Sequence, residues 1–186
     1  MKYKNAIVLT GGIGTGKSTV GSFLKMFGYK IIDADKLSRE VFEEKKEEIK
    51  KIFGTTDRKE LRKIVFNDKK KLNELENIIL PEVKQKVFEM AEKYEKDNVP
   101  YFVDLPLYYE KQNYKEFEKV LLVYAPKEIQ LQRVTKRDNA TEEEVISILN
   151  NQLDIEDKKK MAHFVIDNSK DLKHLQKEIE NFLKMI

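Results

Sequence analysis

The sequence has no cysteine, and it has few histidines, prolines and glycines for its 186 residues. Without cysteine the chain cannot form disulfides, build a thiolate metal site or use a cysteine nucleophile. The two histidines, His163 and His174, are far from each other in the sequence and from any acidic cluster. Cysteine-based enzyme classes are therefore excluded, and both histidines are expected at surface or half-buried positions.

The chain also has little net charge, because 36 basic and 33 acidic residues leave a formal charge of only +3. That balance does not support a global basic field for nucleic acid. No apolar run approaches the length that spans a bilayer, and the first strand begins too early to leave room for a signal peptide. We therefore expect a cytoplasmic protein with no nucleic-acid or membrane partner. The sequence leaves the oligomeric state open, with a monomer favoured.

A glycine-rich stretch near the start has the spacing of a phosphate loop. An apolar run that ends at Leu9 is followed by Gly11, four further residues and then Gly16-Lys17-Ser18. In such loops the backbone N–H groups converge on a phosphate, and the next helix adds the positive end of its dipole. Lys17 is expected to reach the β- and γ-phosphates, and the Ser18 hydroxyl to ligate Mg²⁺. The residues expected to bind a nucleoside triphosphate are Gly12, Ile13, Gly14, Thr15, Gly16, Lys17, Ser18 and Thr19.

Apolar runs of strand length alternate with helical patterns along most of the chain. The strands are expected at residues 5–9, 29–32, 101–104, 120–124 and 164–167. This alternation predicts an α/β fold of the P-loop NTPase type, a five-stranded parallel sheet with helices on both faces. In such sheets ligands gather at the carboxyl ends of the strands, where this chain has several acidic residues.

A long block between the second and third strands has helical spacing and no strand signal. Two parallel strands need only about a dozen residues of crossover, so residues 36–97 predict an inserted helical lobe for a second substrate. Residues 1–35 and 98–186 would form the core of the same single domain. From about residue 127 to residue 152 the pattern predicts two helices around a polar turn, which we expect to act as a small lid. Thr141 and Glu144, three residues apart, predict a capping box at the start of the second helix.

Five side chains outside the loop are candidates for chemistry. Asp33 and Asp35 follow the second strand, where a carboxylate could orient an acceptor hydroxyl and take its proton; helix capping is the alternative role. Asp104, after the third strand, is typical of residues that hold Mg²⁺ directly or through water. Arg133 and Arg137 share one helix face and could neutralise charge on a transferred phosphoryl group, or form surface ion pairs.

Several motifs occur in order along the chain: residues 7–20, 32–35 with 39–41, 57–61 with 65–66, 104–107 with Glu110, 132–133 with 137–138, Gln152 and 165–168. This ordered set resembles the dephospho-CoA kinase family over nearly the whole chain. The resemblance implies an ATP-dependent phosphotransferase with an alcohol acceptor. It would transfer the γ-phosphate of ATP to the ribose 3′-hydroxyl of dephospho-CoA, with Mg²⁺ as the metal, giving coenzyme A and ADP.

The resemblance also implies roles for single residues. Asp33 or Asp35 would be the acceptor-side carboxylate, with Asp35 slightly favoured by its place in the motif. Arg137 would close over the phosphates with Arg133 beside it, and Asn168 would lie near the adenine of ATP.

The block 36–97 would be the lobe that binds CoA. Arg58 and Arg62 are candidates there for contacts to the substrate's phosphates, although surface roles fit them equally well. The chain departs from the family at Leu80-Pro81, where His-Pro is usual.

Two other functions fit parts of the pattern. A kinase for another small metabolite, such as a nucleoside monophosphate, would use the same fold and lobe. A nucleotide-dependent switch would need the loop but no acceptor site. GTP-specific switches generally carry Asn-Lys-x-Asp, a string that does not occur here.

Overall fold

The computed structural model describes residues 2–66 and 68–186. The chain divides into two compact units, a larger one within residues 1–32 and 94–186 and a smaller one of residues 33–93. Each unit has a hydrophobic cluster of its own. The two units are therefore described separately.

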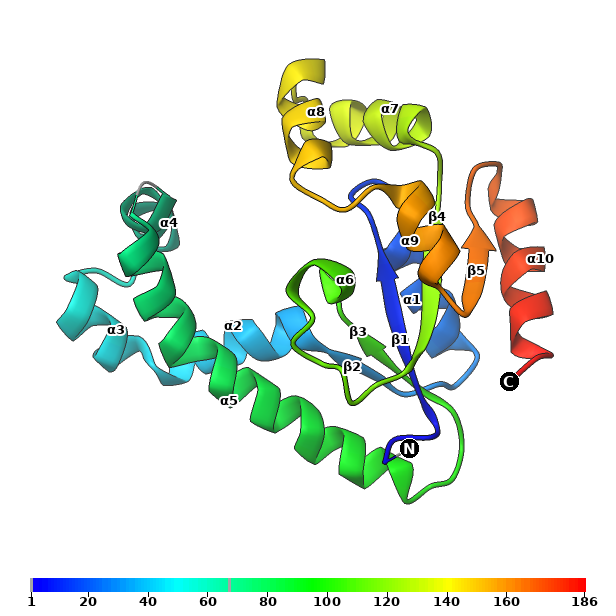
Figure 1. The fold of residues 1–186 in the computed structure, drawn as a ribbon, viewed down its shortest axis with the longest axis horizontal. Helices are drawn as coiled ribbons and strands as arrows, with labels where there is room; N and C mark the ends of the chain where they lie inside the picture. Colours follow the sequence, from blue (N-terminus) through cyan, green and yellow to red (C-terminus); the bar gives the residue numbers. More distant parts are fainter. Residues whose placement is uncertain (1, 67) are drawn as a thin grey trace. The chain divides into compact units, whose positions relative to one another are not determined.

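The larger unit is built on a five-stranded parallel sheet with the strand order β2-β3-β1-β4-β5 (Figure 1). Its strands are β1 (Ala6–Gly11), β2 (Ile31–Asp33), β3 (Tyr101–Asp104), β4 (Lys119–Tyr124) and β5 (Phe164–Asp167). All six residues of β1 are buried, as expected for the central strand of a sheet that is covered on both faces. The predicted α/β fold with a five-stranded parallel sheet is confirmed, although β2 begins two residues later than predicted, at Ile31.

The described part of the larger unit also contains the helices α1 (Lys17–Met26), α6 (Tyr108–Lys111), α7 (Lys127–Asp138), α8 (Glu142–Asn150), α9 (Ile155–Met161) and α10 (Leu172–Leu183). Helices α1 and α10 share one core with the strands, and α10 runs beside β5 (Figure 1). The buried members of this core are Ile7, Leu9, Val20, Leu24, Phe102, Leu121, Val123, Ile166, Leu175, Ile179 and Phe182. This core holds β1 and α1, and with them the loop that joins them.

Helices α7 and α8 pack against each other, as the sequence predicts for two helices around a polar turn. The turn ends at Thr141, whose hydroxyl accepts a hydrogen bond from the Glu144 N–H while the Glu144 carboxylate accepts one from the Thr141 N–H. The expected capping box is therefore present. We refer to α7 and α8 below as the α7–α8 hairpin.

The described residues of the smaller unit form helices joined by short turns. It contains α2 (Ala34–Glu44), α3 (Lys46–Phe53), α4 (Arg58–Phe66) and most of α5 (Lys69–Glu95), which continues through Pro81. Phe42, Ile49 and Leu61 are buried at its centre, and Phe53, Leu75, Ile78 and Ile79 pack against them. No helix in residues 2–66 or 68–186 has the length and apolar character needed to cross a membrane.

Candidate active site

The loop between β1 and α1 has the geometry of an anion-binding site. Gly16 is the N-cap of α1 with a left-handed φ of 88°, and no described side chain caps that helix. The first N–H groups of a helix lack partners within the helix. The Thr19 N–H here donates to the Gly16 oxygen at 3.0 Å, so those of Lys17 and Ser18 are the ones available to a bound anion. Ser18 and Thr19, in the first turn of α1, are exposed to solvent.

Two glycines are required by this loop geometry. Gly14 and Gly16 have φ values of +75° and +88°, which side chains other than glycine rarely adopt. A Cβ atom at Gly16 would lie 2.1 Å from Asn168 Nδ2, and one at Gly14 would lie 2.8 Å from the Gln130 carbonyl oxygen. Glycine is therefore needed at both positions for two reasons: the backbone has a positive φ, and a side chain would clash with neighbouring residues.

Lys17 and Asp104 form an ion pair beside the loop. Lys17 is the first residue of α1, and its Nζ contacts Asp104 Oδ1 at the end of β3. Leu9 of β1 pairs in register with Asp104, which brings the end of β3 alongside the start of the loop. The Lys17 and Asp104 side chains are 17% and 18% exposed. Lys17, which was predicted to bind phosphate, is therefore in contact with Asp104, which was predicted to hold Mg²⁺.

Asn168 and Arg133 also contact the loop, through its backbone carbonyls. Asn168, which is buried, donates from Nδ2 to the Thr15 oxygen at 2.8 Å. Arg133 Nη1 lies 3.5 Å from the Gly14 oxygen, at the long limit of a hydrogen bond. Both residues were predicted at the site, and the structure brings both to the loop.

Arg137 makes a different contact. Its guanidinium donates two hydrogen bonds of 2.7 Å to Asp138, the next residue, and both side chains are largely exposed. These hydrogen bonds lower the pKa of the Asp138 carboxyl and raise the pKa of Arg137. Arg137 thus forms an ion pair with its neighbour at the end of α7.

Two glutamines that the sequence analysis did not place in the site also touch the loop. Gln130, which is 1% exposed, donates to the Ala125 oxygen at 2.7 Å, and its Oε1 would lie 2.7 Å from a Cβ at Gly12. Gln152 accepts a hydrogen bond from the Ile13 N–H at 3.0 Å. Gln152 carried a weak signal as one member of the ordered motifs, whereas Gln130 carried none.

In the smaller unit, Asp33 and Asp35 have different surroundings. Asp33 is the N-cap of α2, and its Oδ1 accepts a hydrogen bond from the Lys36 N–H at 2.8 Å. Asp35 lies in the first turn of the same helix and is exposed. The capping role that was open for either residue therefore belongs to Asp33.

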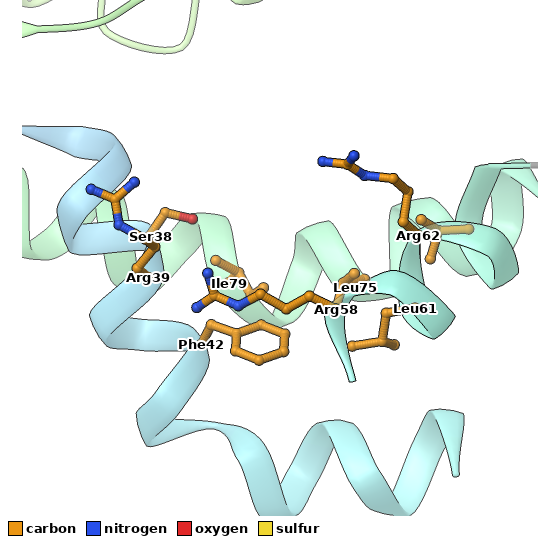
Figure 2. A pocket seen from close by; sticks show the side chains of 9 residues that line it. Ser38, Arg39, Phe42, Arg58, Leu61, Arg62, Leu75 and Ile79 are labelled. Carbon is orange, nitrogen blue, oxygen red and sulfur yellow. The ribbon is translucent and has the colours of Figure 1, made fainter. Parts of the chain in front are cut away.

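The smaller unit also contains a pocket of about 260 Å³, which we call the arginine pocket. Its lining residues are Ser38, Arg39, Phe42, Arg58, Leu61, Arg62, Val65, Leu75 and Ile79. Figure 2 shows the side chains of Arg39, Arg58 and Arg62 together with apolar side chains that line the pocket, and the Arg58 guanidinium lies over Phe42, between the other two. The Arg58 guanidinium lies 4.8 Å from the centre of the Phe42 ring, a cation–π contact, and 3.5 Å from Glu43. The pocket therefore offers positive charge beside an apolar surface.

A family model described as dephospho-CoA kinase matches residues 5–174 of this chain. The chain belongs to the dephospho-CoA kinase family. A dephospho-CoA kinase from Helicobacter pylori is 42% identical over 195 residues, which cover 100% of each chain. One from Wolinella succinogenes is 40% identical and covers 97% of this chain and 94% of that protein.

Solved structures give the same result. The structure of a dephospho-CoA kinase from Campylobacter jejuni is 34% identical, has a TM-score of 0.78, and covers 97% of this chain and 96% of that one. A crystal structure from Thermus thermophilus is also 34% identical, with a TM-score of 0.83 and 97% of each chain covered. The predicted dephospho-CoA kinase family is thus confirmed, and with it the class of ATP-dependent kinase.

Proposed function

We propose that this protein transfers the γ-phosphate of ATP to the ribose 3′-hydroxyl of dephospho-CoA, giving coenzyme A and ADP. The observation that carries the proposal is the Lys17–Asp104 pair beside an uncapped helix N-terminus, in a chain of the dephospho-CoA kinase family. Phosphoryl transfer depends mainly on positioning and on fixed positive charge. Backbone N–H groups, a lysine and a helix dipole supply that charge here.

On the nucleotide side, the phosphates of ATP bind the loop residues 12–19. Lys17 exchanges Asp104 for the β- and γ-phosphates, since charge-assisted bonds to phosphate are strong. Arg133, already next to Gly14, contributes charge at the same place, and Arg137 joins it after leaving Asp138. Asn168 contacts the loop from the side on which we expect the adenine.

Ser18 and Asp104 are the residues that would hold Mg²⁺. Within the described residues, no group of three or more His, Asp or Glu side chains is arranged to hold a metal. Mg²⁺ fits such a site, because it commonly uses one or two protein oxygens together with phosphates and water. An exposed hydroxyl and a carboxylate beside the loop match that requirement. When bound, Mg²⁺ neutralises charge on the β- and γ-phosphates.

On the acceptor side, Asp35 orients the ribose 3′-hydroxyl and takes its proton. The carboxylate of Asp33 is already used to cap α2, whereas Asp35 is exposed and has no such role. A general base must be free to reach the proton that it removes. This difference favours Asp35 more firmly than its place in the motif did.

The arginine pocket is our candidate site for the body of dephospho-CoA. The diphosphate of that substrate requires cations, and Arg39, Arg58 and Arg62 present three guanidinium groups. Its pantetheine arm requires an apolar surface, which Leu61 and Leu75 help to form on the pocket floor. No acidic side chain in residues 2–66 or 68–186 forms an ion pair with Arg39 or Arg62.

A coupled assay of ADP release tests this function. We expect turnover with dephospho-CoA and none with nucleoside monophosphates; turnover with the latter alone would contradict the proposed acceptor. Arg58→Ala and Arg62→Ala should each raise the KM for dephospho-CoA about tenfold and leave the KM for ATP unchanged, because a hydrogen bond to a charged group contributes about 1.5–3 kcal/mol. Lys63→Ala is the matched control, since Lys63 is an exposed cation on the same helix that does not line the pocket.

A monomeric state, a cytoplasmic location and the lack of nucleic-acid or membrane partners stay predictions from the sequence. Light scattering during gel filtration tests the first of these. A mass twice that of the 22.0 kDa chain would contradict it.

A further inference from the structure

Residues 12–15 of the phosphate loop are held by hydrogen bonds within the protein. The Thr15 N–H and hydroxyl both donate to the Gly12 oxygen, at 3.3 and 2.9 Å, and Asn168 donates to the Thr15 oxygen. The Ile13 N–H donates to Gln152 Oε1 at 3.0 Å. An N–H that is already paired inside the protein holds the shape of the loop, whereas those at the start of α1 are the ones left for an anion.

Gln152 lies in the connection between α8 and α9, and that connection is fixed at the next residue. The Leu153 N–H donates to Glu110 Oε1 on α6 at 3.1 Å. The same carboxylate oxygen lies 2.6 Å from Nζ of Lys158, whose side chain is completely buried. Lys158 belongs to α9, which packs against β4. The Glu110–Lys158 pair therefore fixes the backbone next to Gln152 to the core.

We propose that Glu110 is a positioning residue for ATP binding and acts through Gln152, an inference that rests on the proposed binding of ATP in this loop. The carboxylate of Glu110 is held in one place, because moving it would leave the buried ammonium without its counter-charge. It holds the Leu153 N–H, and the Gln152 side chain is thereby aimed at Ile13. The loop then has its shape before the nucleotide arrives, so binding does not have to order it. The bond from Ile13 to Gln152 stays in place when the triphosphate binds.

Calorimetric titration of the full chain with a non-hydrolysable ATP analogue and Mg²⁺ tests the last link. Gln152→Ala removes the acceptor of the Ile13 N–H, and we expect the analogue to bind about fivefold more weakly, the effect of one neutral hydrogen bond. Gln176→Ala is the matched control. It removes an exposed glutamine that is bonded to Glu180 on α10, and it should leave binding unchanged.

The paired replacement of Glu110→Leu with Lys158→Met separates positioning from stability. Neither charge is left alone, so this variant should unfold near the wild-type Tm, but the Leu153 N–H has lost its acceptor. We expect it to bind the analogue about threefold more weakly. Glu110→Gln with Lys158→Met keeps an acceptor oxygen for that N–H and should restore the wild-type affinity. Adding Gln152→Ala to the paired replacement should weaken binding no further than Gln152→Ala alone, because both changes act on the same bond.

Hydrogen exchange at the Ile13 amide supplies a readout that a loss of stability alone would not move. In the empty protein this amide should exchange faster in the paired replacement than in the wild type, although Gln152 is intact. In the wild type it should stay protected after the analogue binds. In the coupled assay of ADP release, Gln152→Ala and the paired replacement should each raise the KM for ATP and leave the KM for dephospho-CoA unchanged.

The proposed function and this inference can fail separately. If the wild type does not bind the analogue, the proposed function fails and this inference falls with it. If the wild type binds it and Gln152→Ala binds it equally well, only the role of Gln152 is refuted. A paired replacement with wild-type Tm and wild-type affinity refutes the role of Glu110, and losses that multiply in the combined variant refute its route through Gln152.

Lys158→Met alone decides the role of the pair if the paired replacement does not fold. It leaves the Glu110 carboxylate, which is 16% exposed, without the ammonium that holds it in place. We expect weaker binding of the analogue and faster exchange at Ile13 in this variant. Wild-type values for both measurements would refute the proposal.

Discussion

Removal of Glu110 should destabilise the protein far more than its position on a short surface helix indicates. Lys158 on α9 is completely buried, and its ammonium lies 2.6 Å from Glu110, whose side chain is 16% exposed. Glu110→Ala would leave that ammonium buried without its counter-charge, which costs about 3–5 kcal/mol. For a chain of this size, a loss of 1 kcal/mol in the free energy of unfolding lowers Tm by about 2–4 °C. We therefore expect Tm to fall by about 6–20 °C.

Thermal unfolding followed by circular dichroism measures this shift, with two further variants for comparison. The double variant Glu110→Leu with Lys158→Met should unfold near the wild-type Tm, because an apolar pair replaces the charged one and neither charge is left alone. Lys160→Met is the control. Its ion pair with Asp157 is exposed and should contribute less than about 1 kcal/mol. If Glu110→Ala lowers Tm no more than Lys160→Met does, the argument from burial is wrong.

Four further results are expected. Lys17→Ala should lower kcat by about 10²–10³, the usual cost of removing one charge-stabilising donor, and a near-normal rate would exclude Lys17 from the site. Asp35→Asn should reduce kcat and leave the KM for ATP nearly unchanged; if Asp33→Asn is the more damaging variant, the roles of the two carboxylates must be exchanged. Thr141→Ala should cost about 1 kcal/mol in chemical denaturation through loss of the cap on α8, with serine at this position as the control that keeps it. Chelation of divalent cations should abolish turnover and added Mg²⁺ should restore it, whereas full activity in chelator would contradict a metal held by Asp104.

The sequence predicted best those features whose cause is local. The glycine spacing of the loop reflects backbone conformations at Gly14 and Gly16 that few other residues adopt, so it can be recognised without a structure. The cap at Thr141 depends on two residues in one turn of helix, and it was predicted for the same reason. The strands are runs of mostly apolar residues, and the central strand β1 is buried throughout, so the sequence pattern of the sheet is clear.

Features that depend on distant partners could not be predicted. Lys158 lies in a run of three lysines, a pattern that is typical of a solvated surface. Only the structure shows that its side chain is buried and paired with Glu110. Helices α6 and α9 span only 4 and 7 residues, too few for a periodic pattern to be recognised. Gln130 touches the loop because α7 packs beneath it, and nothing in its own neighbourhood in the sequence indicates this.

The ion pair between Lys17 and Asp104 has a consequence for which anions the empty loop will accept. The two charges neutralise each other, so the vacant loop attracts small anions less than its lysine alone would. An anion that takes Lys17 removes this cation from a carboxylate that is 18% exposed, which is costly. With Mg²⁺ held by Asp104 as proposed, a metal-loaded triphosphate would satisfy both members of the pair, whereas inorganic phosphate or sulfate would satisfy only the lysine. The pair would then favour a nucleotide that arrives with its metal.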